Sequence, residues 1–124
     1  SAMARAVVEK GYAVKFVSAY EFCSLMLTVH TSPISERNAL LHDVLACDLL
    51  VIDDLGTEPM LKNVTVEYLL LTLEERQTKG RATIITTNLS GENILNRYGE
   101  RIYSRLSHKQ YSMIILMQGN DLRL

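Results

Sequence analysis

Hydrophobic residues along the chain fall into two patterns, short continuous apolar runs and longer stretches in which apolar residues recur every three or four positions. A continuous apolar run bounded by polar or turn residues is typical of a strand buried on both faces of a parallel sheet. The run that leads into two adjacent carboxylates, within residues 47–56, is the clearest example. The pattern predicts strands within residues 12–17, 47–56, 82–88 and 111–119.

Amphipathic stretches between these strands predict helices. Ser18 and Ser35 are expected to cap the first two, and a longer helix is expected over residues 65–79. A short helix and then a second one, over residues 99–106, are expected before the last strand. Strands that alternate with helices of about 10 to 15 residues indicate βαβ units, a parallel sheet and right-handed crossovers.

The beginning of the chain is expected to be helical after a short non-native stretch. Residues 1–3 look like an expression remnant. Residues 4–11 are expected to be the last turns of a helix, with Gly11 as its C-cap. No internal repeat, low-complexity tract or linker divides the rest of the chain, so residues 4–124 are predicted to form one domain.

Composition narrows the class of protein. The 124 residues are 48% hydrophobic and 22% charged, which is typical of one compact domain with a sizeable core. No apolar run approaches the roughly 18 residues of a membrane span, and no signal peptide begins the chain, so we expect a cytoplasmic protein without membrane association. A net charge of −1 argues against a dedicated nucleic-acid-coating domain, although it leaves room for a local basic patch. The two cysteines are expected to be small buried hydrophobes.

Polar residues follow two of the predicted strands. Asp53 and Asp54 end the first, and Thr86, Thr87 and Asn88 end the second. Ligands of open α/β sheets lie at the carboxyl ends of the strands, where two carboxylates suit a hydrated divalent cation that also binds substrate phosphates. An Asn beside them can orient a water molecule towards a terminal phosphate. The alternative is ordinary turn chemistry for the Asp pair and a cap or turn role for Asn88.

Arginines spaced by four residues follow the second polar strand end. A continuous helix would align Arg97, Arg101 and Arg105 on one face, but Gly99 makes continuity doubtful, so the interpretation rests on Arg101 and Arg105. They are either a solvated face or arginine fingers that stabilise charge on the phosphate of a neighbouring active site. Arg123 is either a further phosphate sensor or part of a frayed terminus.

Three segments carry a family resemblance: DLLVIDDLGTEP, GRATIITTNLS and RYGERIYSRLSHK. In this order and spacing they resemble the AAA+ core of the DnaC/DnaI-type helicase loaders, with the IstB transposition helpers as close relatives. GYAVKFVSAYEF is also similar to the second-strand segment of that family. The resemblance extends over residues 4–123 and implies an α/β, parallel-sheet, three-layer P-loop NTPase core that uses ATP and Mg²⁺.

The same resemblance implies roles for the polar strand ends. Asp53 would hold Mg²⁺ through water, and Asp54 would take the place of the catalytic acid of the Walker B motif. Asn88 would be sensor 1. The side chain of Asp54 is one methylene shorter than the Glu of many AAA+ proteins, which makes its role as the base less certain than the role of Asp53.

The resemblance also implies roles for the arginines and for partners. Arg105 would match the arginine finger, Arg101 would be its neighbour in the same segment, and Arg123 would be a candidate for sensor 2. Such proteins associate with the replicative helicase and contact single-stranded DNA. Self-association through the arginine finger would place each arginine at the nucleotide of the next subunit.

One departure from the family limits what this chain can do. A P-loop requires a glycine-rich turn followed by Lys and Ser or Thr, and none of the six glycines forms that motif. We therefore expect the amino-terminal region and first strand of the family to be absent, and we interpret the chain as a fragment, a partial AAA+ domain over residues 4–124. We expect no measurable ATPase activity and at best weak nucleotide binding from this chain alone.

The missing first strand has a structural consequence. The family's strand order is 5-1-4-3-2, so the loss of strand 1 leaves unpaired edges on its two neighbours. The predicted strand within residues 111–119 is expected either to pair directly with residues 82–88 or to exchange with a second copy in a dimer.

Three functions remain open. The first is an ATP-dependent loader that delivers a ring helicase onto single-stranded DNA, and the second is an IstB-like transposition helper. The third is a non-catalytic AAA+ adaptor that binds a partner without hydrolysis. A P-loop lysine encoded upstream would exclude the adaptor, and association with the replicative helicase would separate the loader from the transposition helper. The residues that contact DNA cannot be located from the sequence.

Overall fold

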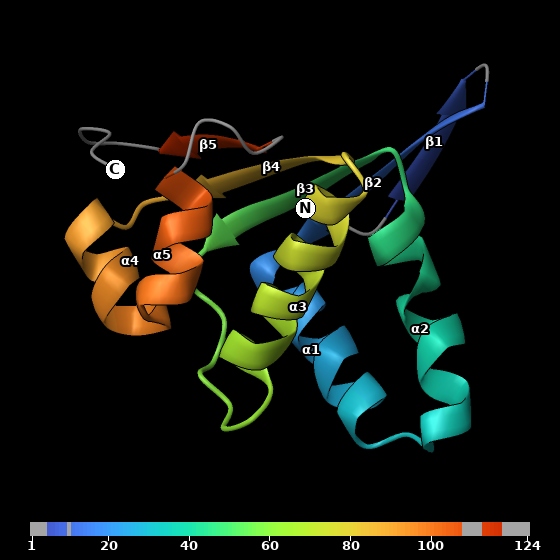
Figure 1. The fold of residues 1–124 in the computed structure, drawn as a ribbon, viewed down its shortest axis with the longest axis horizontal. Helices are drawn as coiled ribbons and strands as arrows, with labels where there is room; N and C mark the ends of the chain where they lie inside the picture. The colour runs from blue at the N-terminus through green and yellow to red at the C-terminus, as the bar shows by residue number, and fades with distance from the viewer. Residues whose placement is uncertain (1–4, 10, 108–112, 118–124) are drawn as a thin grey trace.

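A computed structural model describes residues 5–9, 11–107 and 113–117 (Figure 1). Predicted strands and helices from residue 12 onward are confirmed, with boundaries that shift by one or two residues. The elements in chain order are β1 (Arg5–Glu9), β2 (Tyr12–Ser18), α1 (Ala19–His30), α2 (Ile34–Ala46), β3 (Leu49–Leu55), α3 (Thr65–Thr78), β4 (Ala82–Thr87), α4 (Gly91–Tyr98), α5 (Glu100–Ser107) and β5 (Met113–Met117).

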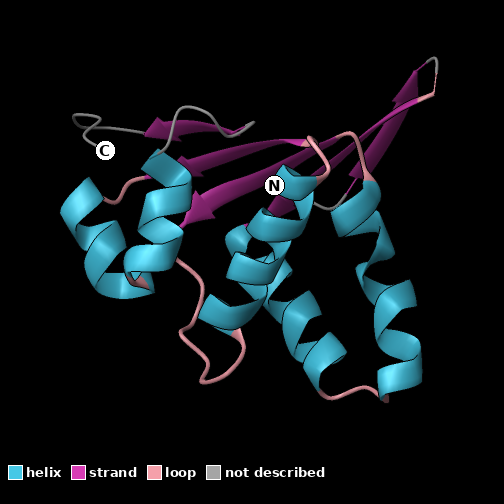
Figure 2. Cartoon of the chain, in the orientation of Figure 1, coloured by secondary structure: helices cyan, strands magenta, loops and turns pink. Residues whose placement is uncertain are grey.

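The strands form one sheet in the order β1-β2-β3-β4-β5. β2, β3, β4 and β5 are parallel to one another, and β1 is antiparallel to β2. This confirms the α/β class with a parallel sheet, consistent with part of a P-loop NTPase core. The described helices all lie on one face of the sheet (Figure 2). Each helical connection leads to the next strand in the same direction across the sheet, and right-handed crossovers that run in one direction place their helices on the same face. The described residues thus form two of the three predicted layers.

The prediction of a helix over residues 4–11 is wrong. Arg5–Glu9 is strand β1, which pairs with β2 so that Glu9 lies opposite Tyr12. Two residues therefore connect the strands, and Gly11 has φ +82°, as tight hairpin turns require. The adjacent β-branched residues Val7 and Val8 favour a strand over a helix. A glycine that was predicted to end a helix belongs instead to a hairpin turn.

The last strand completes the sheet within the chain. β5 pairs in parallel with β4, with Ile114 opposite Ile84 and Leu116 opposite Thr86. Direct pairing, the first of the two predicted alternatives, is therefore what the structure has. No exchange with a second copy is needed to satisfy the edge of β4.

Local signals explain where the first two helices begin. The Ser18 side chain accepts a hydrogen bond from the Glu21 N–H, and the Glu21 carboxylate accepts one from the Ser18 N–H, which forms a capping box and confirms the predicted cap. The prediction of Ser35 as the cap of α2 is wrong. The cap is Pro33, with φ −58° and no side-chain hydrogen bond, because its fixed φ already suits the start of a helix.

The hydrophobic core lies between the helices and β2, β3 and β4. Cys23 and Cys47 are both free and buried in it, as predicted. No helix in the described part of the chain is long and apolar enough to cross a membrane. The fully buried apolar side chains of the core include Met26, Val29, Val44, Leu50, Ile52, Leu69, Leu73, Ile85, Ile94 and Ile102.

A fully buried arginine crosses this core below the amino ends of the strands. Arg76 on α3 has an exposed fraction of 0%. Its guanidinium donates hydrogen bonds to the carbonyls of Val44, Cys47 and Ala82, at 2.9, 2.8 and 2.6 Å. Its Nε donates to the Thr83 hydroxyl at 2.9 Å. One side chain therefore joins α3 to α2, to the segment that leads into β3 and to β4, at the edge opposite to Asp53 and Asp54.

Candidate functional site

The two acidic residues lie where β3 ends. Asp53 and Asp54 are half-buried, and the pairing with β4 is interrupted between Ile52 and Leu55. Asp54 has φ +66°, in the left-handed region that residues other than glycine rarely adopt. Such strained residues cluster at functional sites, where the surrounding structure holds them in place.

Thr86 of β4 holds both acidic residues. Its hydroxyl accepts a hydrogen bond from the Asp54 N–H at 2.7 Å and donates one to Asp53 Oδ1 at 2.5 Å. The hydroxyl therefore supports the strained backbone of Asp54 and orients the carboxylate of Asp53. The sequence had indicated a polar end to this strand without assigning a role to Thr86.

Hydrogen bonds and side-chain packing connect the loop after β3 to the loop after β4. The Thr87 hydroxyl donates to the Leu55 carbonyl at 2.6 Å and accepts from the Leu89 N–H at 3.1 Å. Gly56 has φ +113°, and a Cβ at this position would lie 2.8 Å from a Leu89 methyl group. Asn88 lies within this joined segment, directly after β4, and is exposed. No hydrogen bond among the described residues connects it to the acidic pair, so its water-orienting role stays a prediction.

The acidic pair suits a cation that arrives with phosphates. Across the described residues, no group of three or more His, Cys, Asp or Glu side chains is arranged to hold a metal ion. A hydrated Mg²⁺ needs only one or two carboxylates when phosphates supply other ligands. Thr86 engages one oxygen of Asp53, and two adjacent carboxylates meet that requirement in number. A Mg²⁺ bound there would stabilise the negative charge of transferring phosphates.

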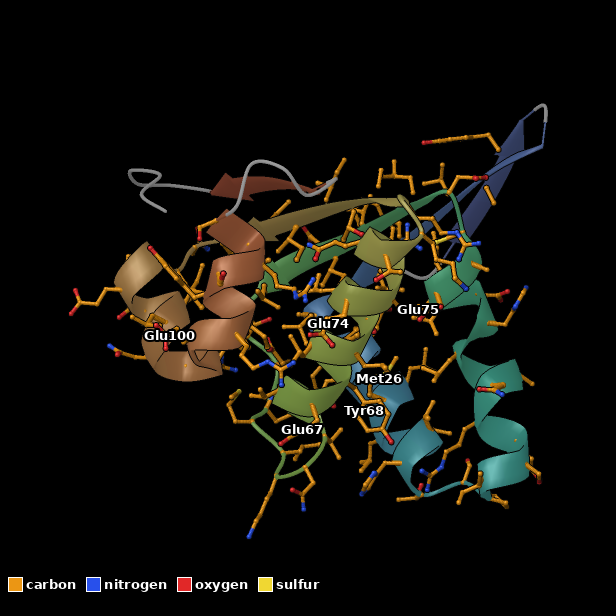
Figure 3. All side chains as sticks on the ribbon, in the orientation of Figure 1. Met26, Glu67, Tyr68, Glu74, Glu75 and Glu100 are labelled. Atoms are coloured by element: carbon orange, nitrogen blue, oxygen red, sulfur yellow. The ribbon has the colours of Figure 1, made fainter. Side chains whose placement is uncertain are left out.

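Arg101 and Arg105 lie on α5, where their described contacts are with α3. Arg101 and Arg105 both contact Glu74 Oε2, at 3.0 and 3.2 Å, and Arg105 also donates to Gln77 at 2.7 Å. Glu74 projects from α3 towards α5 (Figure 3). The side chain of Arg101 is 75% exposed and that of Arg105 is 28% exposed.

An open groove of about 380 Å³ runs along α5 beside these arginines, lined by Glu100, Arg101, Ser104 and Arg105. Gly99 has φ +94° and separates α4 from α5, so the doubt about a continuous helix was correct. The described contacts of Arg101 and Arg105 are with Glu74 and Gln77 on α3, and their role as arginine fingers stays a prediction. Arg123 lies outside the described residues.

A buried cluster that the sequence did not predict connects the loop after β3 to α4. The Glu58 carboxylate accepts hydrogen bonds from the Gly56 N–H at 2.8 Å and from the Tyr98 hydroxyl at 2.5 Å. Arg97 Nη2 lies 3.8 Å from Glu58 Oε1 and also donates to the Glu58 carbonyl. Arg97 Nε donates to the Tyr98 hydroxyl at 3.1 Å. Only 3% of the Glu58 side chain is exposed.

Burial, and then the hydrogen bond from Tyr98 to the charged Glu58, raise the pKa of the Tyr98 phenol above its ordinary value. The unfolded chain therefore releases this proton first as the pH rises, near pH 10. The cluster's contribution to stability is complete below that pH and decreases above it. Above about pH 10 the free energy of unfolding should fall as the pH rises. We expect this slope to be steeper in the wild type than in Tyr98→Phe, by up to about 1.4 kcal/mol per pH unit.

Urea unfolding followed by circular dichroism between pH 8 and pH 11 measures this difference in slope. The control is Tyr20→Phe, because Tyr20 is 60% exposed, and this variant should keep the wild-type slope. Equal slopes in the wild type and Tyr98→Phe would contradict the raised pKa.

Comparisons with known proteins agree with the geometry. A family model described as "IstB-like ATP binding protein" matches residues 1–124. The chain is also 35% identical over 78 residues to the protein named replicative helicase loader DnaC from Buchnera aphidicola subsp. Acyrthosiphon pisum. The protein of the same name from the subspecies Schizaphis graminum has the same identity over 78 residues. Each alignment covers 61% of this chain but only 30% of the relative.

Proposed function

Because the chain belongs to the family of IstB-like ATP-binding proteins, we propose that it carries the Walker B, sensor 1 and arginine segments of an ATP-dependent helicase loader. The loader would deliver a ring helicase onto single-stranded DNA. The observation that carries this proposal is the acidic pair at the end of β3, fixed by the Thr86 hydroxyl. The likeness to the DnaC proteins favours the loader over other members of the family.

In this proposal each site residue has a separate task. Asp53 would hold Mg²⁺ through water, and the ion would supply positive charge to the phosphates. Asp54 accepts the proton of the attacking water. Asn88 orients that water. Arg105, with Arg101 beside it, stabilises charge at the nucleotide of a neighbouring copy, and Arg123 is a candidate for a further phosphate contact.

A second candidate is a transposition helper of the IstB kind. It is supported by the family model, which matches residues 1–124, whereas the likeness to the DnaC proteins covers 61% of the chain. A third candidate is a non-catalytic adaptor, which a P-loop lysine in the complete gene product would exclude.

Two measurements test the proposal. Calorimetry with Mg²⁺-ATP on residues 1–124 should detect at most weak binding, because this sequence contains no phosphate-binding loop. Micromolar affinity would contradict that expectation. The complete gene product should copurify with the replicative helicase of its own organism, and Arg105→Ala should leave that association intact while reducing ATP turnover. Turnover without helicase association would favour the transposition helper, and association without turnover would favour the adaptor.

A further inference from the structure

The Glu58 cluster buries a charge that the proposed chemistry does not use. Glu58 is 4% exposed, lies five residues after Asp53, and has the Gly56 N–H, the Tyr98 hydroxyl and Arg97 as its partners. A buried ion pair adds little net stability compared with apolar residues of the same volume, because desolvation offsets the attraction. Stability alone therefore does not account for a carboxylate at this position, and its geometry suggests another role.

Each partner of Glu58 connects it to the candidate site. Gly56, which donates to the carboxylate, is two residues from the strained Asp54 and packs against Leu89, the residue after Asn88. Tyr98, which donates to the other carboxylate oxygen, lies at the end of α4, and this helix begins three residues after Asn88. Glu58 thus holds the loop after β3 and the helix after β4 at a fixed separation.

We propose that Glu58 is a positioning residue for the acidic pair. It fixes Gly56 through its carboxylate, so that the end of β3 keeps the conformation in which the Asp54 N–H reaches the Thr86 hydroxyl. Tyr98 and Arg97 hold the carboxylate from α4. The proposal rests on the proposed function only where Asp53 and Asp54 are given a part in ATP hydrolysis. The positioning of these two residues by Glu58 does not depend on that function.

Three substitutions separate positioning from general stability. Tyr98→Phe removes one hydrogen bond to the carboxylate and keeps the ring. Glu58→Met removes the carboxylate and keeps much of its volume. Glu58→Gln is the conservative variant, because its amide oxygen can still accept from the Gly56 N–H. Tyr68→Phe is the matched control, since it removes a tyrosine hydroxyl whose described partner is His30 and not a residue of the cluster.

The first readout is amide hydrogen exchange measured by NMR. In Glu58→Met and Tyr98→Phe the amides of Gly56 and Asp54 should exchange about tenfold faster or more, because each variant loses a hydrogen bond to a charged group. The Arg81 amide, which bonds to the Arg76 carbonyl at the other edge of the sheet, should keep its rate after correction for global stability. Glu58→Gln should keep the Gly56 rate within about threefold of the wild type.

The second readout is Mn²⁺ alone, used in place of Mg²⁺. Line broadening in the wild type should centre on the amides of Asp53 and Asp54. The apparent affinity should fall by roughly threefold or more in Glu58→Met and Tyr98→Phe, since residues that orient ligands tune metal affinity. Glu58→Gln and Tyr68→Phe should keep the wild-type affinity.

Unchanged corrected exchange at Gly56 and Asp54 in both Glu58→Met and Tyr98→Phe would overturn the proposal. So would faster exchange that is uniform over the chain, because this pattern means a loss of stability only. Local exchange effects in the two variants, together with no Mn²⁺ broadening in the wild type, would contradict the cation site and would still support the positioning role. The two failures are therefore distinguishable.

Discussion

Replacing Arg76 by Met is expected to destabilise the chain by about 3–5 kcal/mol. The substitution keeps the length of the side chain but removes every donor, so the carbonyls of Val44, Cys47 and Ala82 lose their buried partner. Each buried group without a partner costs about 1–3 kcal/mol. Domains have a total stability of only about 5–15 kcal/mol, so the variant should be marginally folded at room temperature. Urea unfolding followed by circular dichroism measures the loss.

Arg81→Met is the matched control for this prediction. Arg81 is half-buried, and its side chain donates one described hydrogen bond, to the Leu45 carbonyl at 3.0 Å. Its replacement should cost about 1 kcal/mol. Arg76→Lys should lie between the two, because an ammonium cannot reproduce the planar fork of donors that reaches α2, Cys47 and β4. A loss below about 1 kcal/mol in Arg76→Met would contradict the role assigned to this side chain.

Replacing Asp54 by Asn is expected to lower ATP turnover by about 10²–10⁴-fold, the usual contribution of a general base, with almost no change in stability. Asn adopts the left-handed conformation as readily as Asp does, and among the described residues the Asp54 carboxylate has no hydrogen-bond partner that Asn would lose. Turnover is measured in the complete gene product, and the free energy of unfolding is measured in residues 1–124. Function and stability should separate at this one position.

Asp54→Gly sharpens the same test. Glycine adopts φ +66° without steric cost, so this variant should be up to about 1 kcal/mol more stable than the wild type. Its ATP turnover should be lost, because it has no carboxylate at this position. Asp54→Glu should retain turnover, because the family resemblance places Glu at this position in many AAA+ proteins. Turnover in Asp54→Asn within about threefold of the wild type would exclude Asp54 as the base.

Most of the fold was predictable because it follows from local periodicity. The apolar run before Asp53 and the amphipathic stripe of α1 each determine an element without reference to distant residues. The hairpin of β1 was missed because a glycine after a charged pair is equally compatible with a helix C-cap and a tight turn. Only the pairing of β1 with β2, which the sequence does not display, decides between them.

The candidate site was predictable only where residues lie at strand ends. Asp53, Asp54 and Asn88 were placed at one edge of the sheet by the parallel topology alone. Glu58 was missed because its partner Tyr98 is 40 residues away and no spacing rule connects them. Arg76 did leave a signal, since it lies three residues after the buried Leu73, on the apolar face of α3.

Each strand of this sheet lies beside the strand that precedes it in the chain. Every parallel pairing therefore joins strands that are consecutive in the chain, and no described strand lies between two consecutive ones. The β1–β2 pairing closes only a tight turn, whereas each parallel pairing joins residues 30 to 35 positions apart, such as Val14 with Leu49, at a larger loop-closure cost. We therefore expect the β1–β2 hairpin to be the pairing that forms fastest.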